Sequence, residues 1–141
     1  MVCMGRILGV DFGEARTGLA LSDETETIAR ALPAWERKGG VRLAEHLQNL
    51  VQENGVVKIV LGFPRKMDGS LGQVAEEVLN LKEELSKSLD VPIFLWDERF
   101  SSVSARRLLK DHQVRTKKDK KIIDTISAVL ILQSYLDSQR K

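Results

Sequence analysis

Three acidic positions stand out because their neighbours are apolar. Asp11 follows the short apolar run 6–10, Glu98 follows the apolar run 91–96 with Asp97 beside it, and Asp124 lies inside an apolar segment near the C-terminus. A carboxylate in such surroundings is costly unless it is paired, protonated or bound to a metal. Carboxylates without histidine or cysteine form the all-oxygen kind of site that Mg²⁺ or Mn²⁺ prefers.

A concentrated basic segment accompanies these acids. Residues 106–121 carry eight lysines and arginines against two aspartates, although the whole chain has a net charge of only +2. Such a segment is typical of a protein that binds a polyanion such as nucleic acid, and a solvated lysine-rich loop is the alternative. Together with a carboxylate site, it indicates phosphodiester hydrolysis in which metal ions activate water and stabilise the leaving oxygen.

Each acid also has an ordinary structural explanation. Asp11, which precedes Phe12 and Gly13, is compatible with a simple turn. The run 97–99 is compatible with a surface ion pair or a helix cap, and Asp124 with a first-turn acid favoured by the helix dipole. The catalytic interpretation therefore depends on all three acids occurring together at strand ends and in a buried helix.

Hydrophobic spacing predicts the elements that must position these acids. Strands are expected over 6–10, 18–22, 27–35, 56–62 and 91–96, and helices over 43–54, 73–88, from Ser101 or Ser102 onward, and 120–139. Gly55 should close the first helix, and the last helix, apolar nearly all round, should be buried. The order βββαβαβαα predicts an α/β fold in which helices flank a five-stranded mixed sheet of three antiparallel strands followed by parallel ones.

This topology explains how distant acids can meet. Ligands of open α/β sheets sit at the carboxyl ends of strands, where Asp11 and the Asp97–Glu98 pair are expected. A last helix packed across that end would add Asp124. Adjacent strand residues face opposite ways, so only one of Asp97 and Glu98 should reach a shared metal.

Length and composition limit the alternatives. The chain has 141 residues, which favours one domain over 1–141, and its single cysteine, Cys3, excludes an internal disulfide. Arg6 and Asp11 interrupt the N-terminal apolar run, so no signal peptide is expected there. No apolar run approaches the roughly 20 residues that cross a bilayer. We therefore expect a cytoplasmic protein without a membrane partner.

Four segments resemble the YqgF/RuvX family in order and spacing. They are DFGEARTGLALSD at 11–23, GFPRKMDGS at 62–70, DER at 97–99, and Asp124 within IDTISAVLILQSYLD at 123–137. The resemblance covers nearly the whole chain. Residues 100–102 and Ser127 depart mildly from the family pattern.

The resemblance implies an RNase H-like fold related to the RuvC resolvases and a nuclease domain that requires a divalent metal. It implies either processing of the 5′ end of pre-16S ribosomal RNA or resolution of Holliday junctions, with Asp11, Glu98 and Asp124 as the catalytic and metal-binding acids. The expected partner is structured RNA or branched DNA, and the expected state is a monomer or a weak homodimer.

Other residues are predicted to hold substrate phosphates. Arg16 lies just past Asp11 and is suited to bidentate phosphate binding, with an ion pair to Glu14 or Asp23 as the alternative. Ser70 can cap the following helix, whose N-terminus could accept a phosphate, although a tight turn plus cap is the simpler interpretation. The predicted substrate-binding residues are Arg16, Arg65, Lys66, Ser70, Arg99, Arg115, Lys117 and Lys118.

Two rival functions remain open from the sequence. The Asp-x-Gly opening also resembles the first phosphate loop of actin-like ATPases and sugar kinases, which need two such domains where this chain has one. The other rival function is that of a non-catalytic module that binds nucleic acid through the basic segment. This interpretation predicts that removal of the three acids leaves function intact.

Overall fold

The computed structural model describes residues 5–64, 72–98 and 117–139, and for 117–124 it describes the backbone alone. Nine elements lie in these ranges. They are β1 (Arg6–Asp11), β2 (Arg16–Ser22), β3 (Ala29–Glu36), the 3-10 turn η1 (Arg37–Gly39), α1 (Leu43–Asn54), β4 (Val56–Phe63), α2 (Gln73–Ser88), β5 (Ile93–Asp97) and α4 (Lys117–Gln139). The predicted order of strands and helices is confirmed, while the helix expected after Ser101 or Ser102 lies outside the described residues.

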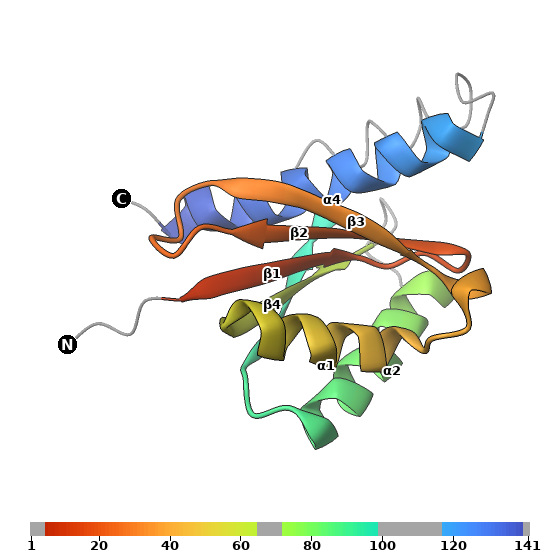
Figure 1. The fold of residues 1–141 in the computed structure, drawn as a ribbon, viewed down its shortest axis with the longest axis horizontal. Helices are drawn as coiled ribbons and strands as arrows, with labels where there is room; N and C mark the ends of the chain where they lie inside the picture. Colours follow the sequence, from red (N-terminus) through yellow and green to blue (C-terminus); the bar gives the residue numbers. More distant parts are fainter. Residues whose placement is uncertain (1–4, 65–71, 99–116, 140–141) are drawn as a thin grey trace.

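The five strands form one mixed sheet in the order β3-β2-β1-β4-β5 (Figure 1). The pairs β1–β2 and β2–β3 are antiparallel, whereas β1–β4 and β4–β5 are parallel. The first strand therefore lies at the centre, and the carboxyl ends of β1, β4 and β5 meet at one edge. The expected α/β architecture is confirmed.

The two faces of the sheet are covered by different helices (Figure 1). Alternate strand residues such as Leu8, Val10 and Leu61 pack with α1 and α2 in one core cluster. Their neighbours in the strands, including Ile7 and Val60, pack against α4 in a second cluster. Because consecutive strand residues face opposite sides of the sheet, each one packs either against α1 and α2 or against α4.

Two glycines let α4 approach the sheet closely. A Cβ atom on Gly9 of β1 would lie 2.7 Å from the Leu132 Cβ atom, and one on Gly62 of β4 would lie 2.6 Å from the Ile131 Cδ1 atom. A side chain at Gly9 would meet an atom fixed to the helix backbone, whereas one at Gly62 would require the end of the Ile131 side chain to move. These strand glycines mark the line along which the helix lies against the sheet.

The last helix is buried less completely than its composition predicts. Its buried residues in the described part form one stripe, comprising Ser127, Ala128, Ile131, Leu132, Tyr135 and Leu136. Val129 and Leu130 are only partly buried. The prediction of burial all round was wrong because hydrophobic composition does not reveal whether another element covers the outer side of a helix.

The ends of the helices follow local backbone chemistry. Gly55 closes α1 with φ of 62°, in the left-handed region that favours glycine, as predicted. The N-cap of α2 is Gly72, which has no side chain with which to cap the helix. The N-cap position therefore lies two residues beyond the predicted Ser70, and Ser70 itself lies outside the described residues.

No helix in the described ranges is both long and apolar enough to cross a bilayer.

Candidate active site

Asp11 is the last residue of the central strand and is almost completely buried, with 5% of its surface exposed. Ile7 and Gly9 contact the α4 layer, so the alternation of β1 directs Asp11 to the same face. Its partner on β2 is Gly18, which has no side chain to fill the neighbouring space. The carboxylate therefore lies on the α4 face at the carboxyl edge of the sheet.

Glu98 follows β5 directly and is buried, with 2% exposed. Its Oε1 atom lies 3.3 Å from the position of a Cβ on Gly62, on the side where Ile131 of α4 also approaches. Gly62 is paired with Trp96 of β5, so the Glu98 side chain extends back over β4. The missing side chain at Gly62 provides the space that this carboxylate occupies.

Asp11 and Glu98 are therefore directed to a common region. Val10 pairs with Leu61, which sets Asp11 level with Gly62, and β4 is the only strand between β1 and β5. Neighbouring strands lie about 4.8 Å apart. Both carboxylates thus border the α4 side of Gly62, as expected for residues that act together.

The structure also separates Glu98 from Asp97. Asp97 pairs with Phe63, whose side chain belongs to the core beneath α1 and α2. Alternation places position 97 on that face and Glu98 on the α4 face with Asp11. This supports the expectation that only one residue of the pair reaches a shared site.

Asp124 belongs to α4, but its side chain lies outside what the structure describes. The helix runs antiparallel to β4, since Ile131 lies against Gly62 near the end of that strand and the Tyr135 hydroxyl accepts a hydrogen bond from Lys58 Nζ near its start, at 2.9 Å. Asp124 precedes Ile131 by seven residues, about 10 Å along the axis and on the same helix face. Its position therefore lies toward the carboxyl edge that carries Asp11 and Glu98.

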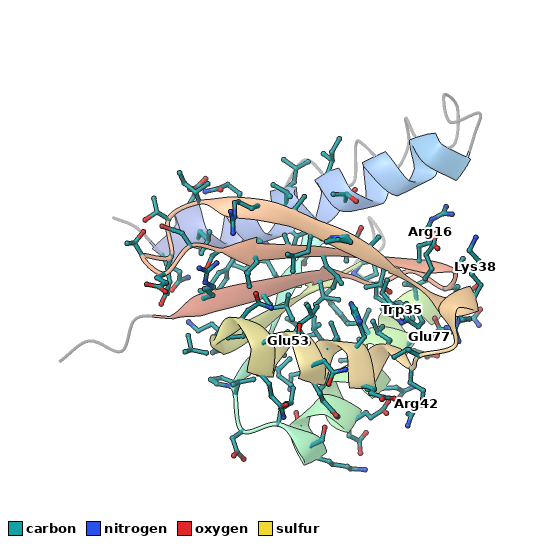
Figure 2. All side chains as sticks on the ribbon, viewed as in Figure 1. Arg16, Trp35, Lys38, Arg42, Glu53 and Glu77 are labelled. Atoms are coloured by element: carbon teal, nitrogen blue, oxygen red, sulfur yellow. The ribbon has the colours of Figure 1, made fainter. Side chains whose placement is uncertain are left out.

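Arg16 lies at the start of β2, at the same end of the molecule (Figure 2). It lines a cavity of about 380 Å³ together with Ala15, Glu36, Arg37 and Lys38. The predicted alternative of an ion pair with Asp23 is wrong, because Asp23 follows the opposite end of β2. The Asp23 carboxylate instead accepts hydrogen bonds from the backbone N–H groups of Thr27 and Ile28, at 2.8 and 3.0 Å.

The other predicted phosphate ligands cannot be placed. Arg65, Lys66, Ser70, Arg99 and Arg115 lie outside the described residues. Lys117 and Lys118 begin α4, and nothing is described of their side chains. Their roles stay predictions.

The sequence model described as "RuvX: Holliday junction resolvase" matches residues 5–138. The chain belongs to the RuvX family. Relatives named "Putative pre-16S rRNA nuclease" include one from Caldanaerobacter subterraneus subsp. tengcongensis, 39% identical over 96% of this chain and 98% of the relative. Another, from Syntrophomonas wolfei subsp. wolfei, is 44% identical over 94% of each chain.

Solved structures share the fold of this RuvX-family chain. Fowlpox virus resolvase in complex with Holliday junction DNA superposes with a TM-score of 0.59 at 12% identity, covering 96% of this chain and 99% of the resolvase. Thermus thermophilus RuvC with a Holliday junction substrate gives 0.58 at 11% identity, covering 95% and 96%. The fold is thus the RNase H-like fold of the RuvC resolvases, as the sequence resemblance implied.

The donor set of the RuvX-family chain fits a hard divalent cation. Asp11 and Glu98 offer only carboxylate oxygens, which Mg²⁺ and Mn²⁺ prefer. Within the ranges described, no three acidic, histidine or cysteine side chains gather closely enough to hold a metal. A third carboxylate from Asp124, whose position in α4 lies toward this edge, would complete the set.

Some residues at this edge of the RuvX-family chain were missed from the sequence. Arg37 and Lys38 join Arg16 because β3 returns antiparallel to β2, which pairs Arg16 with Glu36. The Arg37 Nε atom donates a hydrogen bond of 2.6 Å to the Glu14 carbonyl oxygen. Knowledge of the register between β2 and β3 would have identified Arg37 and Lys38 as neighbours of Arg16.

Proposed function

We propose that the chain is a metal-dependent nuclease that hydrolyses phosphodiester bonds, with Asp11, Glu98 and Asp124 as metal ligands and catalytic acids. The observation that carries this proposal is the burial of Asp11 and Glu98 on one face of the sheet, on either side of Gly62. Buried carboxylates are expensive to maintain, and such arrangements concentrate at functional sites. Membership of the RuvX family supports the same chemistry.

The chain's own residues have distinct tasks in this proposal. Asp11 and Glu98 hold Mg²⁺ or Mn²⁺ from β1 and from the end of β5, and Asp124 holds it from α4. A bound divalent metal supplies activation of water and stabilisation of the leaving oxygen. Ile131 and the buried stripe of α4 keep bulk water away from the inner side of the acids. Arg16 and Lys38 hold substrate phosphates at the adjoining edge, where charge-assisted hydrogen bonds are strong.

The proposed substrate is the 5′ region of pre-16S ribosomal RNA, which would place the protein in the cytoplasm. It is supported by the relatives that carry that name at about 40% identity over nearly the full length. A four-way DNA junction is the second candidate, favoured by the description of the family. Paired cuts in a junction need a symmetric dimer, whereas RNA processing is compatible with a monomer. Sedimentation with and without each substrate therefore separates the two expectations.

The test compares cleavage of a labelled RNA precursor and a four-way DNA junction in Mg²⁺, Mn²⁺ or EDTA. We expect metal-dependent cleavage that Asp11→Asn and Glu98→Gln each reduce at least about 100-fold, the scale of losing one group that stabilises the transition state. Asp90→Asn is the matched control, because Asp90 is exposed and precedes β5 at the opposite edge. Cleavage that survives in Asp11→Asn would contradict the proposal, and binding without cleavage by the wild type would favour a non-catalytic module.

A further inference from the structure

A second cavity lies on the other side of the sheet edge from Asp11. Its volume is about 410 Å³, and it is lined by the ends of β1 and β3, the start of α1 and one face of α2. Trp35, Glu77 and Arg42 gather around it in Figure 2, at the same end of the molecule as Arg16 and Lys38. Sites for small ligands typically have volumes of 300 to 1,000 Å³, so this cavity is large enough for a nucleoside.

One wall of the cavity is aromatic and firmly held. Phe12 is half-buried, and Trp35 is buried with 7% exposed. The Trp35 Nε1–H group donates a hydrogen bond of 2.9 Å to the Val41 carbonyl oxygen, and the Arg37 guanidinium lies 5.8 Å from the centre of the Trp35 ring. A wall of this kind suits a flat unsaturated ring, because unpaired bases are commonly recognised by contact with aromatic side chains.

The opposite wall carries an unsatisfied acceptor. The Oε2 atom of Glu77 is buried and has no hydrogen-bond partner among the described residues. A buried acceptor without a donor is costly and rare in folded proteins. A ligand that presents N–H groups to this carboxylate would remove the cost.

Two arginines also line the cavity. They are Arg37 and Arg42, and Arg42 forms an ion pair with Glu84 of the same lining while its own side chain stays 75% exposed. Such groups favour a ligand that carries phosphate outside the aromatic and acidic part of the site. The aromatic wall, the buried carboxylate and the arginines together suit a nucleotide, which has a flat base, hydrogen-bond donors on the edge of that base and an attached phosphate.

We propose that this cavity binds a guanine base from an unpaired segment of the nucleic-acid substrate. Guanine is the base whose Watson–Crick edge presents two neighbouring donors, N1–H and the N2 amino group, and a carboxylate such as that of Glu77 can accept from both. Phe12 directly follows Asp11, and consecutive residues of a strand face opposite sides. A strand that crosses this edge can therefore place guanine beside Phe12 and a neighbouring phosphate beside Asp11. The inference rests on the proposed nuclease function and adds sequence preference to it.

The first test measures binding without cleavage. Tryptophan fluorescence is titrated with guanosine, inosine and adenosine monophosphates in EDTA, and Trp35→Phe identifies the part of the signal that comes from the cavity. We expect guanosine monophosphate to bind about tenfold more tightly than inosine monophosphate, which lacks the N2 amino group, since one base contact is worth about 1 to 3 kcal/mol. Glu77→Gln should remove this preference, and Glu83→Gln, an exposed position of the same helix, should keep it.

The second test maps cleavage positions on RNA strands that carry guanine or inosine at each site in turn. We expect a fixed distance between a preferred guanine and the cut, and loss of that preference in Glu77→Gln. Equal binding of all nucleotides, or an unchanged cleavage pattern in Glu77→Gln, would overturn the guanine site while leaving the nuclease intact. Guanine binding without cleavage of any strand would instead contradict the proposed function alone. The melting temperature of each variant is measured beside it, so that unfolding is recognised.

Discussion

Buried carboxylates on a shared face would couple the stability of the fold to binding of the proposed metal. Asp11 and Glu98 are both at least nine-tenths buried, and both carry negative charge when ionised. A cation between them replaces repulsion by attraction, and a ligand that binds only the folded state raises stability by mass action.

The first prediction follows from this linkage. Mg²⁺ or Mn²⁺ at 100 times its dissociation constant should stabilise the wild type by about 2.7 kcal/mol. Asp11→Asn should lose most of this gain, while its stability in EDTA should equal or exceed that of the wild type, because one buried charge is gone. Thermal unfolding across a metal titration provides the measurement, with Asp90→Asn as the control. An equal metal effect in Asp11→Asn would count against a shared site.

Asp23 organises the loop between β2 and β3. The backbone N–H of Ile28, the hydroxyl of Thr25 and the backbone N–H of Thr27 all donate hydrogen bonds to its carboxylate, and they hold the pKa of Asp23 well below its usual range. The same loop turns through Glu26, whose φ of 59° lies in the left-handed region. The carboxylate therefore holds together a turn that contains a strained residue.

The second prediction concerns acid stability. The folded pKa of Asp23 is lower than the unfolded value of about 3.9, so the stabilisation is complete above that value and is lost as the pH falls through the folded pKa. Asp23→Asn should be less stable than the wild type at pH 7, and the difference should shrink below about pH 4. Urea unfolding at a series of pH values measures both curves. A difference that stays constant down to pH 2 would show that the carboxylate charge is not involved.

At the level of elements, the contact of α4 with the sheet depends on two small strand positions. Gly9 faces the Leu132 Cβ atom, which is fixed to the helix backbone, whereas Gly62 faces the Ile131 Cδ1 atom at the end of a flexible side chain. The two glycines should therefore respond differently to the same substitution.

The third prediction is that Gly9→Ala destabilises the fold by about 1 to 3 kcal/mol, the usual cost of overpacking a core. Gly39→Ala in η1 is the matched control, because nothing lies within 4 Å of the Cβ position there. Urea unfolding compares the two variants with the wild type. If Gly9→Ala unfolds at the wild-type midpoint, α4 does not lie against β1 as described.

The fourth prediction separates packing from catalysis at Gly62. Gly62→Ala should lower both stability and cleavage, because the new methyl group meets Ile131 Cδ1 at 2.6 Å and Glu98 Oε1 at 3.3 Å. Adding Ile131→Val removes the Cδ1 atom and should recover stability, while cleavage stays low because Glu98 is still displaced. Unfolding and cleavage are measured on the single and double variants. Recovery of both together would show that Gly62 affects the site only through packing.

These elements also show how far sequence reasoning reaches. The bounds of α2 and the end of α1 at Gly55 were predicted because hydrophobic period and a left-handed residue are local signals. The positions of Asp11 and Glu98 at the ends of β1 and β5 were predicted because polar groups at strand ends follow from topology, and their catalytic role stays a prediction. The roles of Gly9, Gly62 and Arg37 were not predicted, since each depends on which distant segment lies against it.

At the level of the whole molecule, charge is unevenly distributed. Residues 106–121 hold eight basic residues and two acids, a local balance of +6, so the rest of the chain carries −4. Arg16, Arg37 and Lys38 add a basic cluster at the edge that bears Asp11. A polyanion should therefore approach the molecule in a preferred orientation.

The fifth prediction is a steep salt dependence of nucleic-acid binding. Each phosphate contact contributes about −0.9 to the slope of log K against log salt on duplex DNA and about −0.7 on single strands. Lys117→Ala and Lys118→Ala should each reduce the slope by about that amount, whereas Lys87→Ala, a residue of α2 paired with Glu83, should not. Fluorescence anisotropy from 50 to 200 mM salt measures the slopes. A slope unchanged in the first two variants would remove these lysines from the interface.

The position of α4 after all five strands in the chain has a consequence for the order of assembly. During synthesis all five strands leave the ribosome before α4, and domains generally fold as they emerge. Until its residues are made, the face with Ile7, Val60 and Asp11 lacks the helix that covers it, and Asp124 is not yet available. In the proposed site, a chain that has folded its five strands but not yet added α4 would therefore lack both the cover of this face and the third acid.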